Sequence, residues 1–265
     1  MLEIARFEWG RRARGTVLLS VAFLALIALT MGLFPSIRET GGELDAYLET
    51  LPPEVARAFV GDVTTLTTIE GYLVSQLYQF GWVILLGIYF AYAAGSTIAS
   101  EVERGRADML LSLPITRARF VVEKFLAFVP VVVAVNVVTF AAIYAGIVLV
   151  DESIDLADMA AVHGVSVLYL LACGGIGLLA SVSFDSVRRA QTVGAGVVFG
   201  TFLLDSITYD TDYEWLGALS ASRHFDPAAI LVAGDLEWTG ILVLAVATVA
   251  LVAASAVVFE RRDLQ

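Results

Sequence analysis

Six long apolar blocks dominate the sequence and limit the folds that are open to it. Each block is long enough to cross about 30 Å of hydrocarbon at about 1.5 Å per helical residue. Only helices and closed β-barrels span that layer, and the blocks lack the alternating pattern of barrel strands. The sequence therefore predicts an all-α integral membrane protein, a single domain of residues 1–265 with six transmembrane helices at residues 16–34, 72–100, 125–150, 160–184, 190–207 and 238–259.

The charges between the blocks predict the orientation. With the amino terminus in the cytoplasm, the inner segments hold 13 of the 16 basic residues and nine of the 27 acidic residues. The outer segments hold three basic and eighteen acidic residues, so the formal charge is +4 inside and −15 outside. This asymmetry predicts a multi-pass protein of the cell membrane with both termini in the cytoplasm. Because the excess acid lies outside, it does not indicate a cationic protein partner, and we expect no nucleic-acid partner.

The amino-terminal residues 1–15 alternate apolar and charged side chains, with Phe7 and Trp9 among the apolar ones. Such a segment is typical of a helix that lies along the inner headgroup layer. The apolar run that follows is too long for a signal peptide, and no small-x-small cleavage site precedes Pro35. We therefore expect an amphipathic amino-terminal helix, followed by an uncleaved first span.

Two long loops are predicted on the outer side. Pro35 is expected to end the first span, and loop 36–71 has helically spaced apolar residues on both sides of Pro52 and Pro53. That pattern predicts two short amphipathic helices on the outer membrane face. Loop 208–237 is rich in aromatic and acidic residues.

The most distinctive inner segment is 101–124. Gly105 permits a tight reversal, Pro114 ends a short turn of helix, and Thr116 is well placed to cap the helix that follows. Between the glycine and the proline, charges of both signs flank three leucines at Leu110, Leu111 and Leu113. A short helix that presents leucines is typical of a docking element. An ordinary solvated loop is the alternative, and it explains the charges but not the leucines.

Segment 101–124 is similar to the inner loop of ABC-2 type transporter permeases. In that loop a Glu-rich helix end, a Gly, an acid before a Leu-Leu pair, a Pro, a Ser/Thr-Arg pair and a following Lys recur. Departures are Arg106, where a small Thr is commoner, and Thr116, which replaces Ser. The resemblance covers essentially the whole chain, because the closing residues 259–264 and the first outer loop also resemble this family. The residues of the first outer loop that carry the resemblance are Leu51, Pro52, Pro53, Phe59, Gly61, Thr68, Glu70, Gly71, Tyr72 and Gln76.

The basic residues carry a second resemblance. Fifteen of the sixteen are Arg, and Lys124 is the only Lys. Together with acidic outer loops, this resembles proteins of halophilic archaea, because concentrated salt screens repulsion within an acidic surface.

The family resemblance implies a permease subunit that works with two copies of an ABC ATPase and with a second permease, identical or different, in the lipid membrane. It implies ATP-driven transport, usually export, and leaves the substrate open. The sequence contains no G-x-x-x-x-G-K-[ST] phosphate loop, so we expect no ATP hydrolysis by this chain and no cofactor. By the same resemblance, residues 1–15 form an elbow helix and the ATPase-coupling residues are Glu101, Glu103, Arg104, Gly105, Arg106, Asp108, Leu110, Leu111, Leu113, Pro114 and Arg117.

Polar and small residues within the blocks are expected to serve helix packing. Asn136 lies mid-span, where an interhelical hydrogen bond is the main interpretation and a substrate contact the alternative. Gly174 and Gly177 in the fourth block, and Gly196 and Gly200 in the fifth, would let helices approach closely, with gating as the alternative. No acid or base lies at mid-bilayer, so nothing indicates proton coupling.

Two other protein classes stay open as alternatives, a scaffold without transport and a membrane-embedded enzyme. The docking-like segment speaks against the scaffold. An intramembrane enzyme would need paired acids, a Ser and His pair, or a His-Glu-x-x-His metal site inside the bundle. The only histidines, His163 and His224, are expected near the outer surface.

Overall fold

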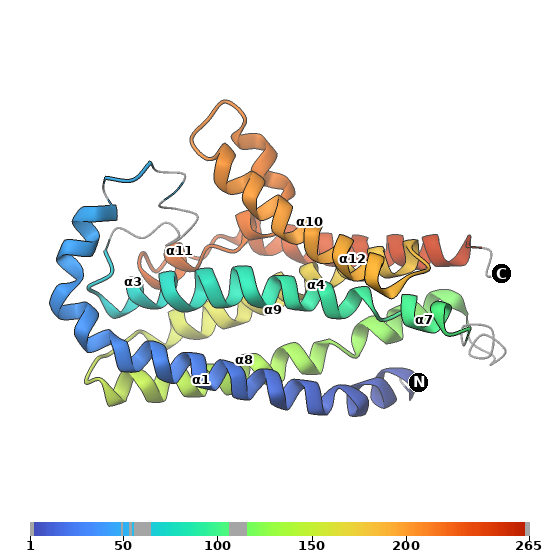
Figure 1. Cartoon of the computed structure of the whole chain (residues 1–265), viewed down its shortest axis with the longest axis horizontal. Coiled ribbons are helices and arrows are strands. Elements are labelled where there is room, and N and C mark those ends of the chain that lie inside the picture. The colour runs from blue at the N-terminus through green and yellow to red at the C-terminus, as the bar shows by residue number, and fades with distance from the viewer. Residues whose placement is uncertain (1–2, 49, 53–54, 56–64, 106–115, 263–265) are drawn as a thin grey trace.

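The computed structural model is a bundle of long helices that lie side by side along one axis (Figure 1). It describes residues 3–48, 50–52, 55, 65–105 and 116–262, and within these ranges it contains helices and no strand. This confirms the predicted all-α membrane fold. Six stretches of the described residues are long and apolar enough to cross a membrane, as predicted. They are Phe7–Thr40, Ile69–Glu103, Arg117–Leu149, Leu156–Ser183, Val187–Thr208 and Trp238–Arg261.

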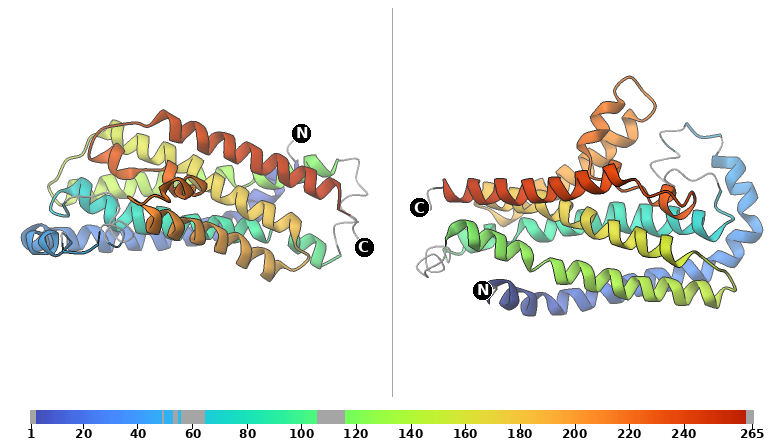
Figure 2. Two further views of the ribbon diagram at one scale, coloured as in Figure 1. Left: turned by 90° about the horizontal axis from the view of Figure 1, so that it is seen from above. Right: turned by 180° about the vertical axis from the view of Figure 1, so that it is seen from behind.

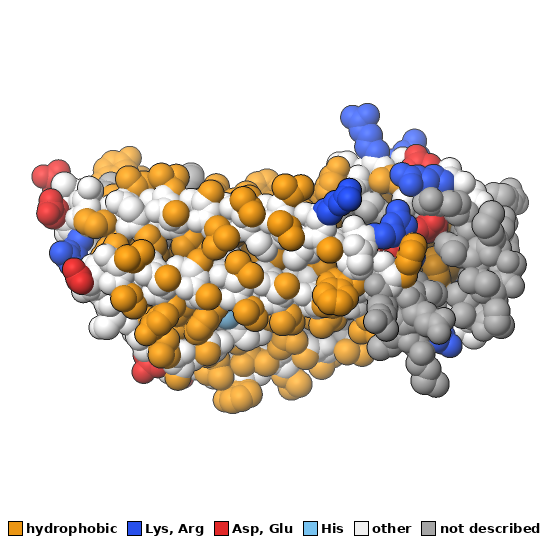
Figure 3. Space-filling model, turned by 90° about the horizontal axis from the view of Figure 1, so that it is seen from below, with side chains coloured by type: hydrophobic (Ala, Val, Ile, Leu, Met, Phe, Trp, Pro, Cys, Tyr) orange, Lys and Arg blue, Asp and Glu red, His pale blue; other side chains and the backbone are white. Residues whose placement is uncertain are grey.

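Both termini lie at one end of the bundle, beside the end of α5 (Ala99–Glu103) and the start of α7 (Arg117–Leu126) (Figures 1 and 2). We call this the terminal end and the opposite one the distal end. Charged side chains gather at the two ends, and a wide apolar belt lies between them (Figure 3). The belt is the surface that a bilayer would cover.

The first helix differs from both predictions made for it. Helix α1 runs without interruption over Glu3–Leu48, so residues 3–15 are not a separate elbow helix, and Pro35 lies inside α1 instead of ending it. No proline or capping signal separates residue 15 from residue 16, and a single Gly15 costs a helix only about 1 kcal/mol. A proline removes one hydrogen bond and bends a helix without necessarily ending it, and α1 changes direction toward the distal end (Figure 1). The first outer loop therefore begins after residue 48, and the second helix predicted there lies largely outside the described residues.

The second span is assembled from several pieces. It begins with α3 (Ile69–Leu73), continues as a π-helix η1 (Val74–Leu86) and then as α4 (Gly87–Gly95), and ends in α5. Turns at residues 96–98 separate α4 from α5. A π-helix of 13 residues is unusual, because π-helical turns normally occur singly and often at functional sites.

The third span is also broken, between α7 and α8 (Val129–Leu149). Pro130 explains the break, because it has no N–H to donate to the carbonyl of Leu126 and its ring collides with that carbonyl. Helix α7 begins at Arg117, so the third span starts earlier than the predicted residue 125. The remaining spans are single helices, namely α9 (Leu156–Ser183), α10 (Val187–Thr208) and α12 (Trp238–Glu260).

Helix α9 is the centre of the bundle and packs against α4, α8, α10 and α12. Large aromatic side chains fill this core, among them Trp82 and Tyr78 of η1 and Tyr169 of α9 itself, and all three are buried. Their polar atoms are paired. The Tyr169 hydroxyl donates to the carbonyl of Val83 at 2.7 Å, and the Tyr78 hydroxyl lies 3.3 Å from Nδ1 of His163. Such pairing lets polar aromatic groups occupy an apolar core.

The second long loop folds onto the distal half of the bundle. It contains η2 (Glu214–Leu219), η3 (Ser222–His224) and α11 (Pro227–Leu231). Phe225 is buried and stacks on Tyr169 with ring centroids 5.3 Å apart. Helix α10 leans away from the bundle toward its distal end, and η2 lies beside it (Figures 1 and 2).

Candidate functional site

Two short helices frame residues 104–116 at the terminal end. Helix α5 ends at Glu103, and Gly105 has a φ of +61°, a left-handed conformation that glycine adopts without a steric penalty at a helix end. Helix α7 begins after Thr116, whose hydroxyl accepts a hydrogen bond from the backbone N–H of Arg119 at 3.2 Å. This bond satisfies one of the free N–H groups at the start of α7.

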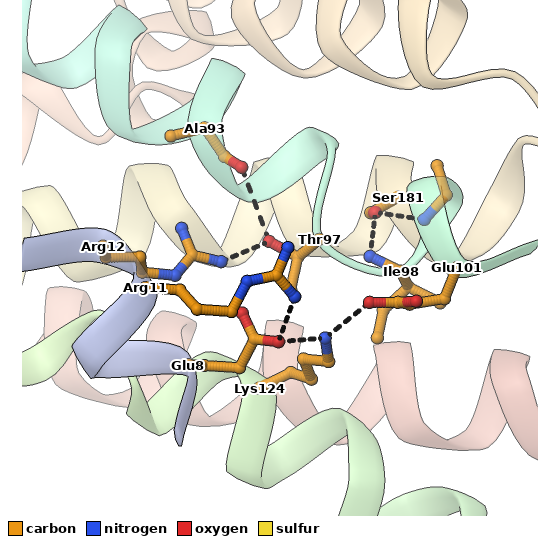
Figure 4. A network of polar contacts seen from close by, with 10 residues as sticks. Glu8, Arg11, Arg12, Ala93, Thr97, Ile98, Glu101, Lys124 and Ser181 are labelled. Carbon is orange, nitrogen blue, oxygen red and sulfur yellow. Dashed lines mark hydrogen bonds and ion pairs between the residues drawn. The ribbon is translucent and has the colours of Figure 1, made fainter. Parts of the chain in front are cut away.

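Lys124 links three elements at this end through two ion pairs. Its Nζ lies 2.6 Å from Oε1 of Glu8 in α1 and 2.9 Å from Oε1 of Glu101 in α5 (Figure 4). We call these three residues the charge cluster. The lysine side chain is only 4% exposed, and both carboxylates are buried as well. Since removing one partner of a buried ion pair is strongly destabilising, the cluster ties α1, α5 and α7 together.

The break between α4 and α5 is bound to the central helix. Ser181 of α9 accepts hydrogen bonds from the backbone N–H groups of Ile98 at 2.8 Å and of Ala99 at 2.9 Å (Figure 4). A helix break buried in protein leaves N–H donors without an intrahelical acceptor, and the serine hydroxyl supplies one. The break is therefore a defined feature of the fold.

Arg12 of α1 contacts both helix breaks. Its Nη2 donates to Oγ1 of Thr97, in the break between α4 and α5, at 3.2 Å (Figure 4). Its guanidinium carbon also lies 3.9 Å from the centroid of the Phe128 ring, in the break between α7 and α8. This geometry is a close cation–π contact. One side chain thus bridges the two points at which the spans around residues 104–116 are interrupted.

Two other predicted coupling residues join the same end of the bundle to α10 and α12. Oε2 of Glu103 accepts from the backbone N–H of Val187, the first residue of α10, at 3.2 Å. Nη1 of Arg117 donates to the carbonyl of Arg262, just beyond α12, at 2.6 Å. An acid at a helix start and a cation at a helix end both suit the helix dipole.

The structure therefore brings together five of the predicted coupling residues, namely Glu101, Glu103, Arg104, Gly105 and Arg117. Of these, Glu101 is buried and Arg104 is exposed. The other predicted members lie outside the described residues, and they are Arg106, Asp108, Leu110, Leu111, Leu113 and Pro114.

Asn136 makes hydrogen bonds between helices. Its Oδ1 accepts from Oγ of Ser166 in α9 at 2.7 Å and from Nε1 of Trp82 in η1 at 3.4 Å. Its Nδ2 donates to the carbonyl of Val132 at 3.0 Å. The amide is buried and joins three elements, so its contacts are those of a packing residue.

The glycines predicted to pack helices divide into three cases. A Cβ on Gly177 would lie 2.0 Å from a backbone oxygen of α4, so α4 and α9 can touch there only without a side chain. A Cβ on Gly174 would make an ordinary contact at 3.6 Å. Gly196 and Gly200 are exposed and have no described atom within 4 Å of such a Cβ, so the packing prediction is wrong for them within this chain. Gly194, two residues before Gly196, packs against α9 and α4 instead.

The sequence matches the family described as ABC-2 family transporter protein over residues 2–264, which is nearly the whole chain. The chain belongs to this family. It is therefore a multi-pass membrane protein and a permease component of an ABC transporter, and such permeases partner in general with an ABC ATPase. No curated protein matches the sequence. The family match does not support a halophilic source, which stays a prediction from composition.

The permease has no candidate metal centre in its described part, where no three His, Cys, Asp or Glu side chains converge in a way that could hold an ion. His163 is buried between Tyr78, Trp82 and Phe140, with ring centroids 5.3 to 5.6 Å away. His224 lies in η3 and contacts the carbonyl of Ala218 at 3.1 Å. Within the described residues, the hydrogen-bond partners of the two histidine rings are Tyr78, Met159 and Ala218, and no carboxylate is among them.

Sequence reasoning missed the charge cluster of the permease. Lys124 was placed at the end of the inner segment 101–124 and was assigned no contact. Its ion-pair partners are 23 and 116 residues away in the chain, so no local pattern reveals them. The one sequence feature that distinguishes Lys124 is that it is the only lysine, whereas all other basic residues of the chain are arginines.

Proposed function

We propose that this chain is the permease subunit of an ATP-driven exporter in the cell membrane, with its terminal end in the cytoplasm. The proposal rests on one arrangement. Residues 104–116 connect α5 to α7 in the chain, and the buried charge cluster joins these two helices to α1. The positive-inside charge distribution favours the same orientation.

The arrangement suits transmission of a mechanical displacement. A partner that displaces residues 104–116 would move α5 and α7 together, because Lys124 of α7 pairs with Glu101 of α5 and with Glu8 of α1. The breaks at 96–98 and 127–128 give the two helices points at which to change direction relative to α4 and α8. Such hinges turn a local displacement into a domain-scale change between inward-facing and outward-facing states.

The composition of the complex is part of the proposal. We expect two ATPase copies and a second permease, because a single chain supplies one segment of this kind and no phosphate loop. The exposed Gly196 and Gly200 leave a close-packing face on α10 that the described part of the chain does not contact. That face suits a helix of the second permease.

A double substitution tests the coupling proposal. Leu110→Asp with Leu111→Asp should abolish stimulation of the co-expressed ATP-hydrolysing subunit, because acidic side chains would replace the apolar contact that we assign to residues 104–116. A matched control is Leu219→Asp, which changes an exposed leucine in η2 at the distal end. Normal assembly and normal stimulated ATPase activity in the double variant would contradict the coupling role. Loss of activity in the control as well would indicate a general folding defect.

A non-transporting scaffold predicts a different result. It would co-purify with partners, but reconstituted vesicles containing it would show no ATP-dependent movement of any substrate. Screening compounds for a change in the ATPase rate of the purified complex is the direct route to the substrate class.

A further inference from the structure

A small cavity of about 120 Å³ lies between α1, α4 and α8 near the terminal end. Its polar lining consists of Arg11, Arg12, Thr16 and Tyr89, and Phe90 and Phe128 form part of its apolar wall. We propose that this cavity binds the phosphate of an anionic membrane lipid. The proposal requires only that the terminal end lies in a headgroup layer, so it is independent of the direction of transport.

Arg12 presents an unused donor at this place. Its Nη2 is bonded to Thr97 and its guanidinium lies over Phe128, but its Nε is buried and has no hydrogen-bond partner. Within the described part of the chain, no ion pair involves Arg12. A buried charged N–H without an acceptor is costly, and an anionic oxygen is the acceptor that complements it.

The surrounding charges leave an excess of positive charge. Among the residues labelled in Figure 4, Glu8 and Glu101 are carboxylates and Lys124, Arg11 and Arg12 are cations, so the formal charges of these five sum to +1. The carboxylate of Glu8 is engaged mainly by Lys124, at 2.6 Å, while the Nη1 atom of Arg11 is 3.7 Å away from it. A ligand with one negative charge would balance the group, and arginine binds phosphate through parallel hydrogen bonds.

The position of the cavity favours a lipid over a free ion. Tyr89 and Tyr92 on α4 are 37% and 48% exposed, as is usual for aromatic residues at a membrane interface. From the cavity toward mid-membrane, α1 presents Val17, Leu18 and Val21, which are each more than half exposed. A lipid could place its phosphate at the arginines and its acyl chains along this apolar face. Basic pockets between transmembrane helices on the cytoplasmic side commonly hold anionic headgroups.

The test is lipid binding by the full-length, detergent-purified permease, measured by native mass spectrometry. The probes are phosphatidylglycerol and phosphatidylcholine with the same acyl chains. We expect the wild type to prefer phosphatidylglycerol and Arg11→Gln to lose about fivefold in affinity for it, which corresponds to about 1 kcal/mol for one basic residue at a headgroup. The matched control is Arg14→Gln, because Arg14 is an exposed arginine on α1 that does not line the cavity. The affinity of Arg14→Gln for phosphatidylglycerol should stay within about twofold of the wild-type affinity, since an exposed charge away from the site contributes little.

Tyr89→Phe gives a second measurement that hardly perturbs the fold, because it removes one hydroxyl from a partly exposed ring. It should weaken phosphatidylglycerol binding and leave phosphatidylcholine binding unchanged. Three results would overturn the proposal: equal binding of both lipids by the wild type, equal losses in Arg11→Gln and Arg14→Gln, or full retention of binding in both Arg11→Gln and Tyr89→Phe. Displacement of phosphatidylglycerol by an equal concentration of inorganic phosphate would reassign the cavity to free phosphate, against the lipid proposal.

Discussion

Replacing Lys124 by Met would leave two buried carboxylates without their ammonium partner. The Nζ atom lies 2.6 Å from Glu8 Oε1 and 2.9 Å from Glu101 Oε1, and the lysine side chain is only 4% exposed. Methionine fills a similar volume, so the change acts mainly on charge. Removing one partner of a buried ion pair costs about 3–5 kcal/mol, and we expect the free energy of unfolding to fall by about that amount.

A triple variant separates the charge effect from packing. Adding Glu8→Gln and Glu101→Gln to Lys124→Met removes all three charges, and charge-free replacement of a buried ionic group is often neutral or stabilising by about 1–4 kcal/mol. We therefore expect the triple variant to recover most of the stability lost in the single variant. It should still couple poorly to the ATPase, because the ionic link between α1, α5 and α7 is gone.

The assay is denaturant unfolding in detergent micelles, followed by intrinsic tryptophan fluorescence. Arg14→Met is the control, since Arg14 is exposed, and it should change the free energy of unfolding by less than about 0.5 kcal/mol. A loss below about 0.5 kcal/mol in Lys124→Met would refute the reasoning. So would a triple variant as unstable as the single one, because the loss would then come from the aliphatic part of the lysine and not from its charge.

Three further predictions concern the rest of the bundle. Gly177→Ala should lower the free energy of unfolding by about 1–3 kcal/mol, because the new Cβ would lie 2.0 Å from a backbone oxygen of α4. Gly196→Ala should be neutral or stabilising by up to about 1 kcal/mol. Thermal unfolding midpoints of the two variants compare them directly. Asn136→Leu should cost about 1–3 kcal/mol in denaturant unfolding, because a buried indole N–H and a serine hydroxyl lose their shared acceptor; an unchanged midpoint would show that these bonds contribute nothing. The hydrogen bond that Arg223 donates to the Glu214 carboxylate raises the pKa of Arg223, so the stabilisation from this bond is present throughout the neutral range and is lost only as pH rises past the ordinary pKa of arginine. Glu214→Gln should therefore reduce stability by about 0.2–1 kcal/mol, equally at about pH 6 and pH 9, and a difference that varied across this range would contradict the assignment.

The fold class and the number of spans could be predicted because they depend on local composition. An apolar run of sufficient length crosses the hydrocarbon whatever it packs against. The ends of the spans were less predictable. Pro35 was taken as the end of a helix that in fact continues to Leu48, and the start of the third span was placed at residue 125 although α7 begins at Arg117. In both places charged or proline-containing sequence continues a helix beyond its apolar part, which hydropathy does not detect.

The ends of the two helices that flank residues 104–116 could be predicted in part from residue types. Gly105 ends one helix and Thr116 caps the next, as their residue types indicate. The glycines were harder to interpret, since glycine pairs at helical spacing occur both on a packed face and on an exposed one. Gly177 is in contact with α4, while Gly196 faces away from the chain, and only the rotation of each helix in the bundle decides which applies.

The sequence by itself determined the membrane class, the number of membrane spans and the charge asymmetry, because each follows from the free energy of placing single residues in hydrocarbon or water. The tertiary structure alone decided which charges meet. Glu8, Glu101 and Lys124 come from distant parts of the chain, and nothing local distinguishes Lys124 from a solvated basic residue. The packing of α1, α5 and α7 excludes water from all three side chains, and burial turns these charges into a structural link between the helices on either side of residues 104–116.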